Sequence, residues 1–144
     1  GGLRLAERAA PDPGPGEVLL RVIAAGLNYR DLMVLRGQYG TGLPDTRVPL
    51  SDGVGEVIAL GQGVTGLAPG DRVIAPHFLG WRDDAAYSPA VFAQDMGVSA
   101  DGWLAERIVL PAAAALRVPE GVGDQTAASL AVVGATVWHA MVAF

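Results

Sequence analysis

Short apolar runs separated by glycine and proline fill most of the first two-thirds of the chain. Apolar and β-branched residues occupy 17–25, 53–60, 71–75, 103–110 and 116–119. Runs of this length, bounded by turn residues, predict strands. The two glycines early in 53–60 indicate a bulge or a close backbone approach. Because strands dominate, the pattern predicts a mainly β domain, a compact β-barrel with helical excursions.

Three segments carry helix signals. Asn28 is a favourable N-cap for a short helix that Gly37 ends. A Ser-Pro pair opens 88–93, where the serine caps a helix and the proline takes its first position. The longest helix is predicted over 124–142, with the aspartate at 124 as its cap. The rest of 76–101 has no clear period, which is typical of a lid or binding loop.

The last helix is apolar nearly all round. Its stretch 127–133 contains one polar residue, Ser129. Such a helix needs cover on both sides, and a barrel of this size supplies one side only. We therefore expect another unit to pack against its second side in the parent protein.

Composition places the chain among globular domains. Its 144 residues suit one domain, and 51% hydrophobic against 17% charged residues exclude a disordered chain. No apolar run reaches the roughly 20 residues that cross a bilayer, so we expect no membrane partner. The N-terminus shows no secretory signal. The first residue is Gly1 rather than methionine, from which we expect a chain trimmed from a longer one.

Charge and missing residue types exclude several functions. The net charge is −5, and the 10 basic residues are all arginine and lie scattered, so no nucleic-acid partner is expected. Without cysteine the chain has no disulfide, thiol nucleophile or thiolate metal site. Without lysine it cannot form a Schiff base. The lack of disulfides is compatible with a cytoplasmic protein, which is our expectation.

Residues 61–66 spell GQGVTG, the G-x-G-x-x-G pattern of dinucleotide-binding loops. Asp83 and Asp84 even lie near the distance expected for a ribose-binding acid. That loop works by placing a pyrophosphate at a helix N-terminus. Here Pro69 and Gly70 follow and exclude the required helix. We therefore interpret the segment as a glycine-rich turn between two strands.

A series of motifs resembles the medium-chain dehydrogenase/reductase superfamily. The motifs are AGLNYRD over 25–31, PLSDGVGEV over 49–57, VTGLAPGDRV over 64–73, GWLAE over 102–106, and AASL over 127–130 followed by Thr136. They occur in order and cover nearly the whole chain. The resemblance implies a partly open GroES-like β-barrel that ends in the helix leading into an absent Rossmann domain. It divides the chain into a GroES-like catalytic domain over 1–124 and a linking helix over 125–144.

Zinc-binding members of this superfamily differ from the chain at their ligand positions. A cysteine stands where the chain has Asn28, a histidine and a glutamate where it has Ser51 and Asp52, and a cysteine or acid near Val132. The four-cysteine structural zinc lobe would fall within 76–101, which has no cysteine. A catalytic zinc needs three protein ligands, which the two histidines of the chain cannot supply. The resemblance is therefore to the zinc-independent branch: quinone oxidoreductases, enoyl reductases and zinc-free alcohol dehydrogenase-like proteins.

The resemblance also implies roles for single residues. Asn28 and Thr136 match positions that approach the nicotinamide end of the cofactor. Tyr39 matches a tyrosine near the substrate carbonyl, whose phenol donates a hydrogen bond or proton, and Arg30 is the second catalytic candidate. Structural alternatives stay open: Asn28 as a helix cap, Thr136 bonded to its own helix, Tyr39 packed on the barrel, and Arg30 paired with an acid such as Asp31.

Aromatic residues supply the candidates for a substrate-binding wall. They are Tyr29, Phe78 and Trp81, with Trp103 as a further possibility, although aromatic residues more often belong to the core. Asp52 replaces the family's glutamate. We expect it to be a turn or hydrogen-bonding residue rather than a general base.

The implied function is that of a substrate-binding and catalytic domain in an NAD- or NADP-dependent oxidoreductase. It would transfer hydride to or from a carbonyl, quinone or enoyl substrate, without a metal, in a parent enzyme that is a homodimer. The cofactor would be bound mainly by the absent domain, so the isolated chain is expected to be inactive. Two alternatives remain open. One is an enoyl reductase module fragment of a polyketide synthase, and the other is a non-catalytic GroES-like binding or scaffold domain.

Overall fold

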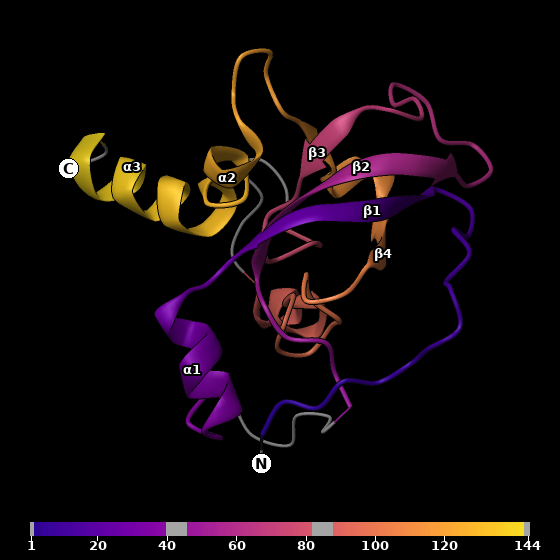
Figure 1. Ribbon diagram of the computed structural model, residues 1–144. Coiled ribbons are helices and arrows are strands. Elements are labelled where there is room, and N and C mark those ends of the chain that lie inside the picture. The colour runs from indigo at the N-terminus through magenta and orange to yellow at the C-terminus, as the bar shows by residue number, and fades with distance from the viewer. Residues whose placement is uncertain (1, 40–45, 82–87, 143–144) are drawn as a thin grey trace.

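The computed structural model describes residues 2–39, 46–81 and 88–142 and is built on one antiparallel sheet (Figure 1). The five strands lie in the order β4-β1-β2-β3-β5, which leaves the sheet open with β4 and β5 at its edges. Their bounds are β1 (Glu17–Gly26), β2 (Asp52–Leu60), β3 (Arg72–Ile74), β4 (Arg107–Pro111) and β5 (Leu116–Arg117). The predicted mainly β fold with a partly open sheet is confirmed.

The long central pair β1–β2 shows why two glycines stand early in β2. The pairing register shifts between Val22 and Ala24, opposite Gly55 and Val54, so the strand is bulged there. A Cβ atom on Gly53 would lie 2.4 Å from Cδ2 of Trp103. Both predicted explanations, a bulge and a close approach, therefore apply.

The main core lies on the face of the sheet that Trp103 covers, apart from a smaller buried cluster of Val54, Ala127 and Ala128. Its largest fully buried side chains are Trp103, Leu20, Met96 and Leu110. The prediction that a strand begins at Trp103 is wrong, because β4 begins at Arg107. The backbone of 102–104 instead donates to the 48–50 segment, and the N–H of Trp103 lies 2.9 Å from the oxygen of Leu50. That pairing turns the indole into the core, so Trp103 is not part of a substrate wall.

The glycine-rich segment 61–66 is a turn between β2 and β3, as predicted. A Cβ on Gly61 would meet the backbone oxygen of Gly14 at 1.8 Å, so the turn packs tightly on the start of β1. Gly63 and Gly66 have φ angles of 80° and 81°, the left-handed region that glycine tolerates. No helix follows, and β3 comes next. Asp83 and Asp84 lie outside the described residues.

The short helices begin where the sequence predicts them. Helix α1 (Tyr29–Leu35) follows Asn28, which is its N-cap. A 3-10 helix, η1 (Pro89–Gln94), has Ser88 as its cap, with its hydroxyl oxygen 3.3 Å from the N–H of Ala90. A further 3-10 turn, η2 (Ala112–Ala114), joins β4 to β5, which is shorter than predicted because Pro119 has no N–H to extend the ladder.

The C-terminal helix is not continuous, which corrects the prediction over 124–142. It is divided into α2 (Asp124–Ala127), a π-helical turn η3 (Leu130–Gly134) and α3 (Ala135–Val142). The cap is Gly123, and Asp124 is the first helical residue. The N–H of Gly134 bonds to the oxygen of Ser129 at 2.9 Å, the i to i−5 bond of a π turn.

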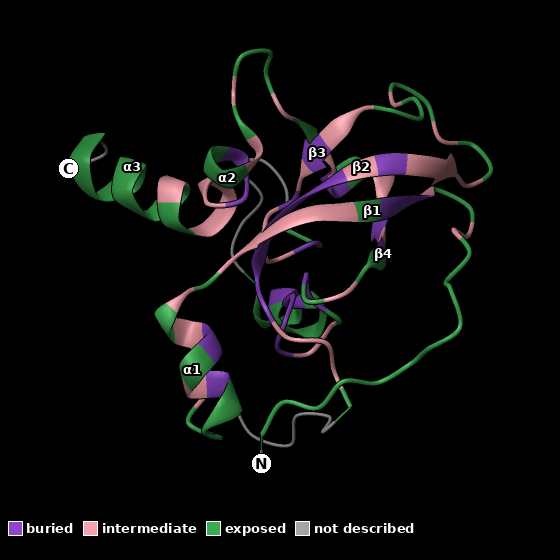
Figure 2. Cartoon of the chain, in the orientation of Figure 1, coloured by how far each residue is buried: buried purple, intermediate pink, exposed green. Residues whose placement is uncertain are grey.

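Helices α1 and α3 extend from the same end of the sheet, and α3 is exposed along its length (Figures 1 and 2). Trp138 on α3 is 68% exposed. Among the described residues no helix is long and apolar enough to cross a membrane.

Candidate functional site

A buried polar cluster forms where β1 ends, α1 and β2 begin, and η3 passes. Its centre is Asp52, which is 1% exposed and is the first residue of β2. The side-chain amide of Asn28 donates to Oδ2 of Asp52 at 3.1 Å. The predicted hydrogen-bonding role of Asp52 is confirmed, although the residue lies in a strand and not in a turn.

Asp52 also holds the π-helical turn. The N–H of Val132 donates to Oδ1 of Asp52 at 2.9 Å, and the N–H of Val133 donates to Oδ2 at 3.4 Å. These N–H groups come from residues 80 and 81 positions further along the chain. One carboxylate thus joins the sheet, the start of α1 and the C-terminal helical segment.

A second buried carboxylate, Asp31, extends the cluster. Its Oδ2 accepts the backbone N–H of Asn28 at 2.8 Å, and its Oδ1 accepts the hydroxyl of Ser51 at 3.2 Å. Leu50, next to Ser51, has a φ angle of 77°, which is uncommon for a bulky residue. The close backbones of Gly97 and Gly102, whose Cβ atoms would lie 2.9 and 2.0 Å from Leu50, leave room for this conformation. The strained turn directs Ser51 into the interior.

Arg30 points away from that cluster and into a second one. One terminal nitrogen contacts both oxygens of Asp95, at 2.6 and 2.7 Å. Arg30 is therefore paired with Asp95 and not with Asp31, the neighbour that the sequence suggested. The guanidinium carbon lies 4.9 Å from the ring centroid of Tyr39, a cation–π contact.

His77 completes the second cluster. Its Nδ1 lies 2.7 Å from Arg30 and 3.0 Å from Oδ1 of Asp95. An arginine nitrogen can only donate and a carboxylate oxygen can only accept, so Nδ1 bonds to one of the two at a time, according to the tautomer of the ring.

An aromatic group continues from His77. The ring centroids of His77 and Phe78 are 3.9 Å apart. Phe78 lies 6.1 Å from Trp81 and makes an edge contact with Phe92 at 5.3 Å. The structure thus brings the predicted residues Tyr39, Arg30, Phe78 and Trp81 into one connected group.

Two predicted residues stand apart from that group. Tyr29, the first residue of α1, is 72% exposed. Thr136 on α3 is exposed, and its hydroxyl donates to the backbone oxygen of Val132 at 2.7 Å, the structural alternative that the sequence left open. Val132 is also the residue whose N–H Asp52 holds.

Asp95 is a member of this group that no sequence pattern predicts. Nothing in the local pattern marks it, because its partners Arg30 and His77 are 65 and 18 positions away. Asp31 carried a recognisable signal: it stands three residues after the helix cap, the spacing of a capping box.

The positions of the zinc ligands in the resembled family meet at the Asp52 cluster. The groups at these positions are the amide of Asn28, the hydroxyl of Ser51, the carboxylate of Asp52 and the backbone of Val132. A catalytic zinc needs three nitrogen, sulfur or carboxylate ligands. Among the described residues no group of three His, Cys, Asp or Glu side chains could hold a metal ion. The donor set therefore does not fit zinc.

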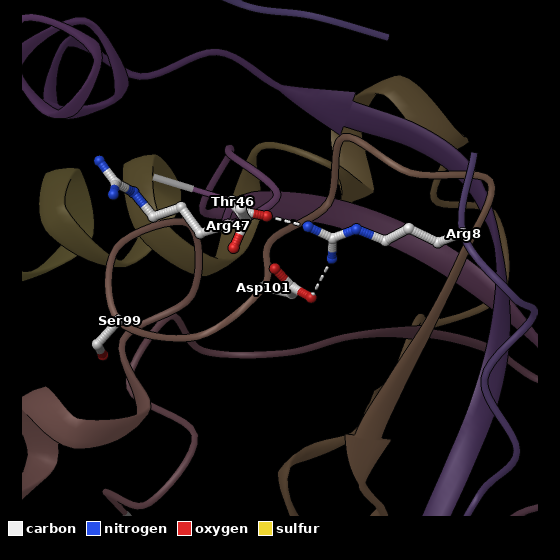
Figure 3. A pocket seen from close by; sticks show the side chains of 5 residues that line it. All are labelled: Arg8, Thr46, Arg47, Ser99 and Asp101. Atoms are coloured by element: carbon white, nitrogen blue, oxygen red, sulfur yellow. Dashed lines mark hydrogen bonds and ion pairs between the residues drawn. The ribbon is translucent and has the colours of Figure 1, made fainter. Parts of the chain in front are cut away.

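A surface cavity of about 470 Å³ lies elsewhere, lined by Arg8, Thr46, Arg47, Ser99 and Asp101 (Figure 3). Arg8 donates to the oxygen of Thr46 and pairs with Asp101 at 2.8 Å. The cavity contains none of the predicted site residues. These contacts hold the N-terminal segment against the domain.

Comparisons with known proteins show the family of the chain. Residues 14–120 match the family described as alcohol dehydrogenase GroES-like domain. A zinc-type alcohol dehydrogenase-like protein of Schizosaccharomyces pombe is 36% identical over 88% of the chain and 36% of its own length. The pikromycin polyketide synthase component PikAII of Streptomyces venezuelae is 42% identical over 68% of the chain and 2% of its own length.

A solved structure of an NAD-dependent alcohol dehydrogenase superposes with a TM-score of 0.78 and 33% identity, covering 93% of the chain and 40% of that protein. The chain thus spans well under half the length of these relatives.

Proposed function

Because the chain belongs to the family of alcohol dehydrogenase GroES-like domains, we propose that it forms the substrate-binding and catalytic part of a zinc-independent, NAD- or NADP-dependent oxidoreductase. The observation that carries the proposal is the connected group of Tyr39, Arg30, His77 and Phe78, in which Arg30 lies two residues after Asn28, the partner of the buried Asp52. A hydroxyl donor, a charge beneath it and an apolar wall are the parts that reduction of a polarised double bond requires.

The nicotinamide, when bound, supplies or accepts the hydride. The phosphate cradle would come from a nucleotide-binding unit, since the glycine-rich segment 61–66 is a turn between strands. Asn28 and Thr136 fit the nicotinamide end of the cofactor, because each is a polar residue next to an exposed apolar one. Leu27 precedes Asn28, and Val137 follows Thr136. A flat ring with an amide substituent needs this combination of surfaces.

Tyr39 is the proposed catalytic residue. Its hydroxyl would donate a hydrogen bond, and then a proton, to the oxygen of a carbonyl or enoyl thioester as negative charge develops there. Arg30 acts through Tyr39 as a positioning residue, since Asp95 fixes its guanidinium against the ring. Phe78 and Trp81 would exclude water on the substrate side.

Zinc independence follows in this proposal from the donor set of the Asp52 cluster. Electrostatic stabilisation by fixed hydrogen-bond donors replaces a Lewis acid. Metal analysis of the purified parent protein tests it: activity that survives dialysis against a chelator, with less than one zinc per ten chains, is expected. Activity lost on chelation and restored by zinc would overturn zinc independence.

The remaining expectations belong to the same proposal. The GroES-like unit ends near residue 124, and 125–144 links it to the nucleotide-binding unit. The parent enzyme is a cytoplasmic homodimer, and the isolated chain is inactive. Similarity to a polyketide synthase component favours an enoyl thioester as substrate, over a quinone or simple ketone.

The deciding experiment follows tryptophan emission of the natural parent protein, and of the 144-residue chain, while NADPH and NADH are added. Saturable quenching in the parent alone is expected, followed by oxidation of the bound cofactor with crotonyl-CoA. Turnover by the 144-residue chain would contradict the proposal that a separate nucleotide-binding unit is needed for activity. A parent protein that binds neither cofactor would leave the non-catalytic binding domain as the function.

A further inference from the structure

We propose that Asp52 is a positioning residue that fixes the orientation of Asn28 and the placement of Thr136 together, in place of the metal that the neighbouring family positions would hold. This rests on the proposed function, in which Asn28 and Thr136 meet the nicotinamide.

Asp52 fixes the orientation of the Asn28 side-chain amide. A carboxylate can only accept hydrogen bonds, so Asn28 must turn its NH₂ group toward Asp52, as the 3.1 Å contact records. Oδ1 of Asn28 then lies on the side away from Asp52. Asp52 thereby decides that Asn28 offers an acceptor, and not a donor, on that side.

Val132 links Asp52 to Thr136. The N–H of Val132 donates to Asp52, and the backbone oxygen of Val132 accepts the hydroxyl of Thr136. The backbone N–H of Val132 is therefore bonded to the sheet, and its backbone oxygen is bonded to α3. A shift of Val132 would move Thr136 with it.

Val132 and Val133 lie near the start of a helical segment, η3. The helix is interrupted at Ala128 and Ser129, and η3 restarts at Leu130. The first N–H groups of a helical segment lack partners within it. The break is itself fixed by packing, because the backbone oxygen of Ala128 lies 2.6 Å from where a Cβ of Gly26 would stand.

Asp52 is almost fully buried, and among the described residues it forms no ion pair. Its charge is balanced by the amide of Asn28 and by two backbone N–H groups. A buried carboxylate needs all such donors, so its position is sharply defined.

The substitution Asp52→Asn isolates the orientation of Asn28. The introduced amide keeps its one oxygen on the N–H of Val132 and presents its NH₂ group to Asn28. Asn28 must then turn over and offer its own NH₂ on the far side. The double variant Asn28→Asp/Asp52→Asn returns an acceptor oxygen to that side and keeps a bonded pair between the two positions.

The first arm of the test needs no cofactor. In the 144-residue chain, hydrogen exchange at the N–H groups of Val132 and Val133 is expected to be at least tenfold faster in Asp52→Ala, and unchanged in the exposed control Asp12→Asn. Asp52→Asn serves where Asp52→Ala does not fold, with a displaced side-chain amide signal of Asn28 as its readout. Unchanged exchange and an unchanged Asn28 signal would overturn the proposal.

The second arm measures NADPH and NADH affinity in the parent protein. Asp52→Asn is expected to weaken binding at least tenfold, and the double variant to recover most of that loss. A merely structural Asp52 predicts no recovery, and that result would overturn the proposal. If the wild-type parent binds neither cofactor, the proposed function fails, while the first arm still decides whether Asp52 fixes Asn28 and Val132.

Discussion

Arg30 and Asp95 lie 65 positions apart in the sequence, yet one guanidinium nitrogen contacts both carboxylate oxygens, at 2.6 and 2.7 Å. Their side chains are only 12% and 1% exposed. This buried pair joins α1 to the 76–101 excursion. It also sets the guanidinium beneath Tyr39, so the excursion and the proposed catalytic residue are held together by one contact.

Removing Asp95 is expected to destabilise the domain. Asp95→Ala leaves Arg30 buried without its counter-ion, which costs about 3 kcal/mol of unfolding free energy. Glu56→Ala is the matched control, because Glu56 pairs with Arg21 at the surface and such pairs contribute at most about 1 kcal/mol. Urea titrations of both variants measure the difference, and equal losses would refute the importance of the buried pair.

Removing the hydroxyl of Tyr39 is expected to lower kcat of the parent enzyme. Tyr39→Phe keeps the ring above Arg30 and deletes only the donor, for a loss of about a hundredfold with little change in KM. Tyr29→Phe provides the comparison, since Tyr29 is exposed at the start of α1. Steady-state kinetics with crotonyl-CoA and NADPH decide, and equal kcat values in the two variants would remove Tyr39 from the mechanism.

Adding one methyl group at Gly53 is expected to disrupt the core. The new Cβ would stand 2.4 Å from the ring of Trp103, so the indole or the strand must move, at a cost of about 2 kcal/mol. Gly2→Ala is the control, because nothing lies within 4 Å of its added methyl group. Thermal unfolding followed by tryptophan emission compares them. An unchanged melting temperature in Gly53→Ala would show that Trp103 is loosely held.

Acid is expected to remove a small contribution from Asp71. The backbone N–H of Ala68 and, next, the side chain of Arg117 hold the pKa of Asp71 below its ordinary value of 3.8. A lowered native pKa means that the carboxylate stabilises the fold above about pH 4, and that this is lost as pH falls through the native pKa.

The check compares melting temperatures of the wild type and Asp71→Asn from about pH 6 to pH 2. The wild type is expected to be the more stable near the upper end of that range, and the gap is expected to close toward the lower end. Asp12→Asn controls for general charge effects. A gap that stays constant with pH would exclude the Asp71 ion pair as its source.

The sequence by itself determined β1, β2 and β3, the turn at 61–66 and the starts of α1 and η1. These features are local: apolar runs, Pro69 and Gly70 after the glycines, and the caps Asn28 and Ser88 act through neighbours a few residues away. Their outcome depends little on the rest of the chain. The family could also be recognised, because its motifs are short and occur in order.

Tertiary structure alone decided the partners of the site residues. Arg30 pairs with Asp95 rather than with the adjacent Asp31, because Asp31 already accepts from Asn28 and Ser51. The break in the C-terminal helix is fixed by the close approach of the Ala128 backbone to Gly26, and it leaves the N–H of Val132 to Asp52, 80 positions upstream. No local pattern carries such information, because a buried carboxylate takes whichever donors the packed fold brings within reach.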